Sequence, residues 1–253
     1  MESVSAALIN FDAPESWPAD LLAYITTHYQ LFLDWESGRT KGIASAYDSA
    51  ISEVGDILQQ YAITGWHCTR LTEAEIAVII SGGMQLPDAT MLRQRIDALL
   101  NAGLLTADVA GRLKANNQAH EQYRAGMVWF CFFPPRLAGE SGIARFFRFW
   151  GGEALYNSHE RDLETGEVIS RIGVPCLVEA DVPIASLSPA GLSFKIVRRF
   201  LISRGFQTGE PVDHEDRIKR PLPRECVRRV IRYPESDFVQ LTGCNSWDVL
   251  LGK

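Results

Sequence analysis

The residues with the clearest capacity for chemistry lie in one short segment, residues 65–71, which reads GWHCTRL. His67 and Thr69 are two positions apart, and residues with that spacing point to the same face of a β-strand. The sequence TEAE, which begins at Thr72, is typical of the start of a helix. An imidazole and a hydroxyl would therefore lie side by side on rigid backbone where a strand turns into a helix. This pattern predicts a binding site for a polar ligand.

A second chemical group is the carboxylate of Glu153, which follows two glycines and is flanked by Trp150 and Tyr156. Glycines let the backbone approach a ligand closely, and aromatic rings can stack on a planar heterocycle. The carboxylate could pair with a ribose hydroxyl or stabilise a developing positive charge. In the alternative interpretation, the glycines only cap a helix, and Glu153 forms an ion pair with Arg145 or Arg148.

The elements that must position these groups follow from hydrophobic spacing. Apolar repeats predict an N-terminal pair of helices at 18–35 and 43–61, then helices at 72–81, 86–101, 106–123 and 142–150. Strands are predicted at 126–133, 172–184, 227–233 and 238–241, whereas 193–204 fits a helix or a strand. This order favours an α+β fold with a mixed or antiparallel sheet.

The composition is that of an ordinary globular protein. The chain has 253 residues, of which 46% are hydrophobic and 22% charged, enough for one large domain or two small ones. We find no apolar run long enough for a membrane span and no secretory signal, so a cytoplasmic location is expected. The five cysteines are scattered without a Cys-x-x-Cys pair, which favours reduced thiols and no metal site.

The charge is unevenly distributed. The whole chain carries a net charge of −6, but residues 191–232 contain eleven Lys and Arg against five Asp and Glu, a local net charge of +6. A basic region on an acidic protein can attract partners that carry phosphate, such as RNA or DNA. The alternative is a solvated helix face with a few internal ion pairs. The basic residues run from Lys195 to Arg232.

Residues 65–70, GWHCTR, resemble the first-strand motif of ADP-ribosyltransferases of the diphtheria-toxin and poly(ADP-ribose)-polymerase type. In that motif a histidine is followed shortly by a small hydroxyl residue or a glycine. The resemblance implies that His67 binds the ribose of NAD and that Thr69 shapes the pocket for its amide. It also implies a split antiparallel sheet with helical insertions, and thus a helical extension over 1–61 and a catalytic domain over 62–253.

The resemblance assigns further roles to residues elsewhere in the chain. Arg70 would neutralise the pyrophosphate of NAD, unless it forms a surface ion pair with Glu73. The aromatic residue under the nicotinamide would be Trp129, Phe130 or Phe132 from the strand, or Tyr156 from the following segment. Glu153 is the first candidate for the catalytic glutamate and Glu179 the second. The one Glu-x-Glu pair, Glu73 and Glu75, opens a helix, where that family does not place its catalytic pair.

The predicted function is therefore an ADP-ribosyltransferase that consumes NAD and modifies a nucleic acid or a protein. A toxin or phage-defence role would fit such an enzyme, with a neutralising antitoxin expected by analogy. One alternative is a nucleotide or nucleic-acid hydrolase that uses His67 with His159 or Glu160. Another is a binding module without enzymatic activity. The markers of Rossmann oxidoreductases, P-loop kinases, zinc proteases and α/β-hydrolases are absent from the sequence.

Overall fold

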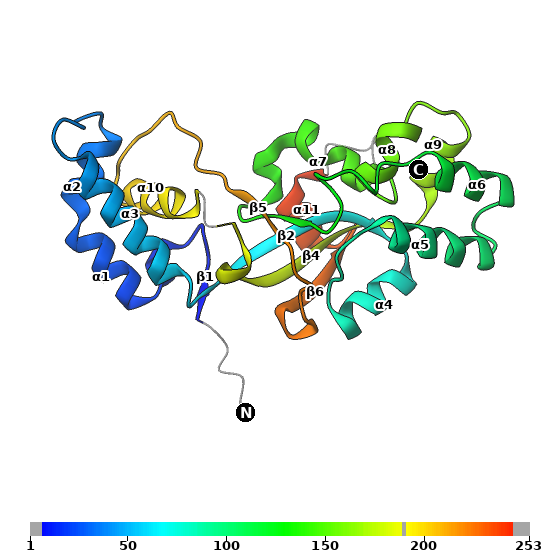
Figure 1. Cartoon of the computed structure of the whole chain (residues 1–253), viewed down its shortest axis with the longest axis horizontal. Coiled ribbons are helices and arrows are strands. Elements are labelled where there is room, and N and C mark those ends of the chain that lie inside the picture. The colour runs from blue at the N-terminus through cyan, green and yellow to red at the C-terminus, as the bar shows by residue number, and fades with distance from the viewer. Residues whose placement is uncertain (1–6, 189–190, 245–253) are drawn as a thin grey trace. The chain divides into compact units, whose positions relative to one another are not determined.

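The computed structural model describes residues 7–188 and 191–244, and it confirms the α+β class. The strands are β1 (Leu8–Ile9), β2 (Ala62–Leu71), β3 (Val128–Cys131), β4 (Val174–Pro183), β5 (Glu215–Ile218) and β6 (Val227–Arg232) (Figure 1). The first helices are α1 (Ala19–Thr27), α2 (Tyr29–Glu36), α3 (Ala44–Leu58), α4 (Glu73–Gly82), α5 (Ala89–Asn101) and α6 (Ala107–Ala115). The later ones are α7 (Gly139–Arg148), α8 (Glu153–His159), α9 (Thr165–Arg171), α10 (Leu192–Ser203) and α11 (Ser236–Thr242).

The strands form one mixed sheet in the order β5-β3-β2-β4-β6, with β1 paired to β2 off this path. β1 runs parallel to β2, and Leu8 lies opposite Ala62. β4 and β6 are antiparallel, with Leu177 opposite Ile231. The strand that carries His67 and Thr69 therefore lies between β3 and β4, inside the sheet.

The chain divides into two compact units, which are described separately. Unit 1 contains the described residues up to Gly65, Cys131–Phe133 and Asp181–Asp216. Unit 2 contains Trp66–Phe130, Pro134–Ala180 and the described residues from Arg217 onward. The N-terminal helices are thus part of a larger unit than the predicted division at residue 61 implies.

Unit 1 is held together by helices from both ends of its sequence. Phe32 and Tyr47 are buried between α2 and α3, and Trp35 stacks on Tyr47 with 4.2 Å between the ring centroids. α10 joins this group through the ion pair of Arg198 with Glu36, whose Nε and Oε2 atoms are 2.7 Å apart. Packing against α10 therefore joins α2 and α3 to a segment from much later in the chain.

In unit 2, the alternation of β2 decides which side chains share a face. Trp66 and Cys68 pack against a hydrophobic cluster that includes Phe147 of α7 and Phe238 of α11. Because neighbouring side chains in a strand point to opposite faces, His67 and Thr69 lie on the other face of the sheet. The sequence-based pairing of these two residues on one strand face agrees with this geometry.

A second hydrophobic cluster of unit 2 connects α5, α6, α8 and α9. Its buried members include Ile96, Leu113, Trp150, Leu155 and Ile169. This cluster fixes the segment that leads from Trp150 into α8, and therefore the place of Glu153 at the start of that helix.

Local capping signals account for the helices that were predicted well. Thr72 and Glu75 form a reciprocal capping box at the start of α4, and Asp88 caps α5. The helix predicted at 106–123 already ends at Ala115. There the side chain of Asn117 donates to the carbonyls of Leu113 and Lys114, which satisfies the end of the helix.

The strand predicted at 238–241 is wrong, because residues Ser236–Thr242 form α11. Phe238 is buried, and Gly243 ends the helix with a positive φ of 71°. A run of four residues is too short to distinguish a buried helical turn from a strand. The segment 193–204, which fitted either structure, is helix α10.

Gly173 fixes the approach of β4 to the end of β2. Its φ is +66°, and a Cβ atom placed there would lie 2.3 Å from the carbonyl oxygen of Leu71. We expect Gly173→Ala to lower the free energy of unfolding by about 2 kcal/mol or more, from backbone strain and this clash. Urea unfolding checks this, with Gly111→Ala as control, because a Cβ at Gly111 of α6 meets nothing within 4 Å. Equal midpoints for Gly173→Ala and the wild type would contradict the prediction.

Candidate functional site

The imidazole of His67 is held by one specific hydrogen bond. Its Nδ1 atom lies 2.9 Å from the carbonyl oxygen of Trp129 in the neighbouring strand β3. A carbonyl oxygen can only accept, so Nδ1 carries the proton, and Nε2 of the neutral ring is an acceptor. The tautomer is thus assigned by the backbone of β3. The ring is oriented before any ligand arrives.

Burial lowers the pKa of the His67 imidazole. The contact with the Trp129 carbonyl opposes this shift, whereas the charge of Arg95 adds to it. The folded protein therefore keeps His67 neutral at pH 7. A neutral imidazole with one lone pair available suits the binding of a hydroxyl group.

Thr69 follows on the same face of β2 and is half-buried. Its hydroxyl forms no hydrogen bond with the residues that the structure describes. His67 and Thr69 together thus place one acceptor nitrogen and one hydroxyl on a single strand. These are the two predicted ligand-binding residues that the structure brings side by side.

Arg70 has a different position from the one that the sequence suggested. Its side chain is buried, Nε donates to the carbonyl of Ile172 at 2.7 Å, and Nη1 donates to the carbonyl of Phe147 at 3.0 Å. Burial lowers the pKa of Arg70 to about 10, so the side chain is still a cation at pH 7. This geometry makes Arg70 a link between β2 and the ends of α7 and α9 instead of a pyrophosphate ligand. The alternative pair with Glu73 is also absent, since Glu73 binds Arg232.

Of the four aromatic candidates, Phe130 lies beside His67, whereas Trp129 and Tyr156 do not. Phe130 is the neighbour of the His67 ring, with 6.1 Å between the ring centroids. Trp129 therefore points to the opposite face of β3, where its half-exposed ring lies 4.9 Å from the guanidinium of Arg217. Tyr156 is buried in the second hydrophobic cluster of unit 2 and is not an open stacking platform. Its ring lies under Arg145 at 4.2 Å.

Glu153 is the first residue of α8, directly after Gly152, whose φ is +58°. Its carboxylate accepts a hydrogen bond from the Tyr156 hydroxyl at 3.2 Å and lies 3.4 Å from Nε of Arg124. Arg124 lies four residues before the start of β3, the strand whose Trp129 carbonyl accepts the hydrogen bond from His67. The alternative interpretation paired Glu153 with Arg145 or Arg148, but within the described residues Glu153 pairs with Arg124, and Arg145 binds Glu160.

The other carboxylate candidate, Glu179, has a structural position. It is buried on β4 and accepts hydrogen bonds from Nε and Nη2 of Arg229 at 3.2 and 3.1 Å. Arg228 adds a second ion pair at 3.6 Å. Glu179 also lies on the face of β4 that carries Leu177, which packs with Trp66 away from His67. Glu153 is therefore the more open of the two.

Sequence reasoning missed a polar cluster on the His67 side, formed by Glu75, Arg95 and Trp150. Glu75 accepts from Nε of Arg95 at 2.6 Å and from Nε1 of Trp150 at 3.0 Å. Burial alone would raise the pKa of Glu75, but the charge of Arg95 and these hydrogen bonds outweigh it and lower the pKa. The guanidinium of Arg95 lies 4.7 Å from the Trp150 ring. The capping box showed where Glu75 lies, but nothing local predicts its partners.

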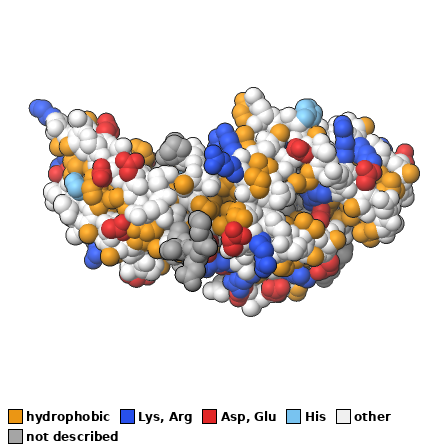
Figure 2. Space-filling model, turned by 60° about the horizontal axis from the view of Figure 1, so that its bottom comes forward, with side chains coloured by type: hydrophobic (Ala, Val, Ile, Leu, Met, Phe, Trp, Pro, Cys, Tyr) orange, Lys and Arg blue, Asp and Glu red, His pale blue; other side chains and the backbone are white. Residues whose placement is uncertain are grey.

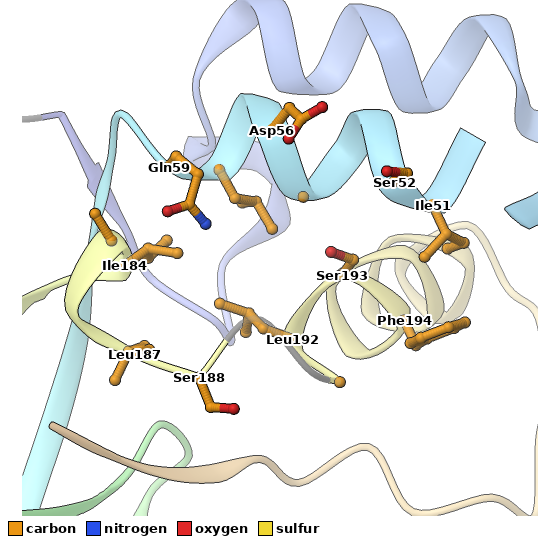
Figure 3. Close-up of a pocket in the computed structure, with 14 residues that line it drawn as sticks. Ile51, Ser52, Asp56, Gln59, Ile184, Leu187, Ser188, Leu192, Ser193 and Phe194 are labelled. Carbon is orange, nitrogen blue, oxygen red and sulfur yellow. The ribbon is translucent and has the colours of Figure 1, made fainter. Parts of the chain in front are cut away.

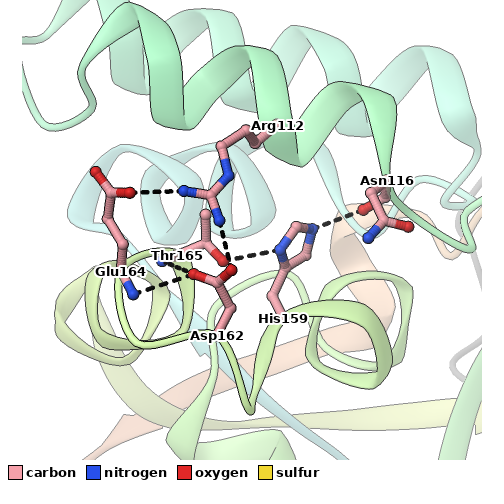
Figure 4. Close-up of polar contacts among 6 residues, drawn as sticks. All are labelled: Arg112, Asn116, His159, Asp162, Glu164 and Thr165. Carbon is pink, nitrogen blue, oxygen red and sulfur yellow. Dashed lines mark hydrogen bonds and ion pairs between the residues drawn. The ribbon is translucent and has the colours of Figure 1, made fainter.

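His159 is structural, which removes it as a partner for His67 in a hydrolase. It is buried, and both ring nitrogens are used, one by the Thr165 hydroxyl at 2.9 Å and one by the Asn116 carbonyl at 2.6 Å (Figure 4). Arg112 pairs with Asp162 and Glu164 beside it. The contacts connect α6 with the α8–α9 segment.

The basic region between Lys195 and Arg232 is largely engaged within the protein. Five of its arginines form ion pairs: Arg198 with Glu36, Arg199 with Asp12, Arg228 and Arg229 with Glu179, and Arg232 with Glu73. Lys195 donates to the Pro211 carbonyl. On the face drawn in Figure 2, Lys and Arg lie in several separate groups next to Asp and Glu. The internal ion pairs of the alternative interpretation thus account for much of this charge.

No protein-family model matches this chain, and no match was found among the curated proteins or the solved structures. Within residues 7–188 and 191–244, no helix has the length and apolar character needed to cross a membrane. In the same residues, no group of three or more His, Cys, Asp or Glu side chains could hold a metal ion. Within the described residues, which include all five cysteines, no disulfide is formed.

Proposed function

We propose that this chain is an NAD-dependent ADP-ribosyltransferase, with the sheet arrangement of that family, that modifies a macromolecular acceptor, either a nucleic acid or a protein. NAD binds on the His67 face of β2. The observation that carries the proposal is the state of His67. The Trp129 carbonyl fixes its tautomer, burial keeps it neutral, and Thr69 lies beside it on the same strand face.

His67 and Thr69 have complementary roles in this proposal. The lone pair on Nε2 accepts a hydrogen bond from a ribose hydroxyl of NAD. The Thr69 hydroxyl binds the carboxamide of the nicotinamide. Both side chains extend from a strand inside a sheet, so little freedom is lost when NAD binds. Fixed geometry of this kind favours the reactive orientation of the substrate.

The reaction breaks the bond between C1′ of the ribose and the nicotinamide nitrogen. The bonding electron pair leaves with nicotinamide, and positive charge grows on the ribose. A carboxylate near the ribose stabilises this charge, and we assign that role to Glu153. Its side chain is 43% exposed, against 11% for Glu179. A nucleophile of the acceptor then forms a bond to C1′ and loses its proton.

Replacing His67 tests the proposal directly. We expect His67→Ala to raise KM for NAD by about tenfold, the value of one strong hydrogen bond, in an assay of nicotinamide release. His28→Ala is the matched control, because Nδ1 of His28 also contacts a backbone carbonyl, that of Tyr24, at 3.1 Å. The pH dependence of activity gives a second test. Because the pKa of His67 lies below its usual 6.5, activity should persist below pH 6.5 and fall only when Nε2 is protonated.

The acceptor is identified with NAD labelled in its adenylate part, offered together with RNA, DNA or protein. Label on one of these supports the transferase and names its acceptor. Release of nicotinamide without any label transfer would overturn the transferase and leave an NAD hydrolase. Binding of nucleic acid that weakens with salt, without any turnover of NAD and unchanged in His67→Ala, would instead favour the binding module.

A further inference from the structure

Unit 1 contains a cavity of about 450 Å³ that takes no part in the proposed NAD site. It is lined by α3, by the short 3-10 helix Ile184–Ser186, and by the start of α10 (Figure 3). Its apolar wall includes Ile51, Leu58, Ile184, Leu187 and Leu192. The volume is that of a site for a small molecule.

Ser193 supplies a polar group to this cavity. It is only 6% exposed, and its hydroxyl has no hydrogen bond with the residues that the structure describes. Figure 3 shows the hydroxyl directed from α10 toward α3. Gly55 faces it from α3, and a Cβ atom at Gly55 would lie 3.2 Å from the Ser193 oxygen. A hydroxyl that lines a cavity and has no partner among the described residues is available to bind a ligand.

The same place is the N-terminus of α10, a helix of 12 residues. Gly191, with a φ of +100°, precedes it and provides no side-chain cap. Among the described residues, the first N–H of α10 that donates to a backbone carbonyl is that of Lys195, which donates to Gly191 at 3.2 Å. The N–H groups of Leu192, Ser193 and Phe194 therefore have no partner within the helix. Free N–H groups and the helix dipole together attract an anion.

We propose that this cavity binds a small anion carried on an apolar body, such as a phosphate ester or a carboxylate. Its oxygens accept from the N–H groups at the start of α10 and from the Ser193 hydroxyl, and its body packs on Ile51, Leu58 and Leu192. Asp56 is the one carboxylate among the described lining residues. It is exposed, and Figure 3 places it apart from Ser193, on the other side of the α3 ribbon.

Amide shifts of the ¹⁵N-labelled full chain test this proposal with two anions, phenyl phosphate and benzoate, and with neutral benzyl alcohol and inorganic phosphate as comparisons. We expect one or both anions to shift the amides of Leu192–Phe194, and the comparison of the two distinguishes phosphate from carboxylate. The amides at the start of α6 should not move, because Thr106 caps that helix. Ser193→Ala should weaken binding by about fivefold, the value of one hydrogen bond.

Ser49→Ala is the control for removing a serine hydroxyl, since Ser49 is exposed on α3, which lines the cavity, but is not itself a lining residue. Gly55→Ala gives a second route, because its methyl group crowds the Ser193 hydroxyl and should also weaken binding. Absence of shifts with both anions would overturn the proposal. If benzyl alcohol bound as tightly as the aromatic anions, the site would not need a negative charge. If inorganic phosphate bound as tightly as phenyl phosphate, it would not need an apolar body. Nicotinamide release plays no part in this test, so it is independent of the NAD proposal.

Discussion

Glu153→Gln is expected to lower kcat for NAD cleavage by about 100- to 1000-fold while KM for NAD changes little. The amide keeps the size of the side chain and can still accept from the Tyr156 hydroxyl, now 3.2 Å from the carboxylate. It removes the negative charge that would stabilise the ribose cation. Loss of one preorganised electrostatic group in an active site typically costs two to three orders of magnitude. An effect on kcat alone indicates an interaction made in the transition state.

The chain offers a matched control in Glu121. Like Glu153, it pairs with Arg124, and the two side chains are 39% and 43% exposed. Glu121→Gln removes the same charge from the same arginine, and it should leave kcat within about twofold, because a surface ion pair contributes little. Equal losses in both variants would assign the effect to Arg124 and remove Glu153 from the reaction. A fully active Glu153→Gln would place the catalytic carboxylate elsewhere.

The parts of the site that sequence reasoning could predict depend on local rules. The alternation of a strand is enough to put His67 and Thr69 on one face. The capping box of Thr72 and Glu75 is enough to place the start of α4. In each case the residues that decide the structure are within a few positions of each other. The environment of His67, which comes from β3, could not be obtained in this way.

The predictions that failed concern side chains whose partners are distant in sequence. Arg70 binds the carbonyls of Phe147 and Ile172, which are 77 and 102 residues away. His159 binds Asn116 across 43 residues. Both side chains looked like surface or ligand-binding groups because charged and polar residues are mostly exposed. Only tertiary packing shows that they are buried and satisfied by the backbone.

Two short strands of the sheet, β5 and β1, could not be predicted for a different reason. β5 was not predicted, because its sequence, EDRI, lacks the alternation of a half-buried strand. Charged residues on an edge strand protect it from pairing with other chains, and the same residues hide it from sequence analysis. The two-residue β1 is too short to give any periodic signal. The central strand β4 was predicted within residues 172–184, because its apolar residues are interrupted only by Glu179 and Asp181.

Replacing Arg70 distinguishes the structural link seen in the fold from the predicted role as a pyrophosphate ligand. We expect Arg70→Met to lower the free energy of unfolding by about 3 to 5 kcal/mol, measured by urea denaturation. The methionine fills a similar volume, but the carbonyls of Phe147 and Ile172 lose their donors inside the protein. Each buried polar group without a partner costs about 1–3 kcal/mol, and hydrogen bonds from a charged donor are at the upper end.

Arg70→Lys tests whether the positive charge at this position is sufficient or whether the geometry of the guanidinium is also needed. A single ammonium group keeps the positive charge, but it cannot reproduce the two-pronged donation of the guanidinium, so this variant should recover only part of the loss. Arg171→Met is the control for replacing an arginine, because that side chain is 73% exposed and should change stability by about 0.5 kcal/mol or less. If Arg70→Met were as stable as the wild type and only its KM for NAD rose, Arg70 would be a pyrophosphate ligand after all. Because both donors already bind backbone carbonyls, we expect a loss of stability instead.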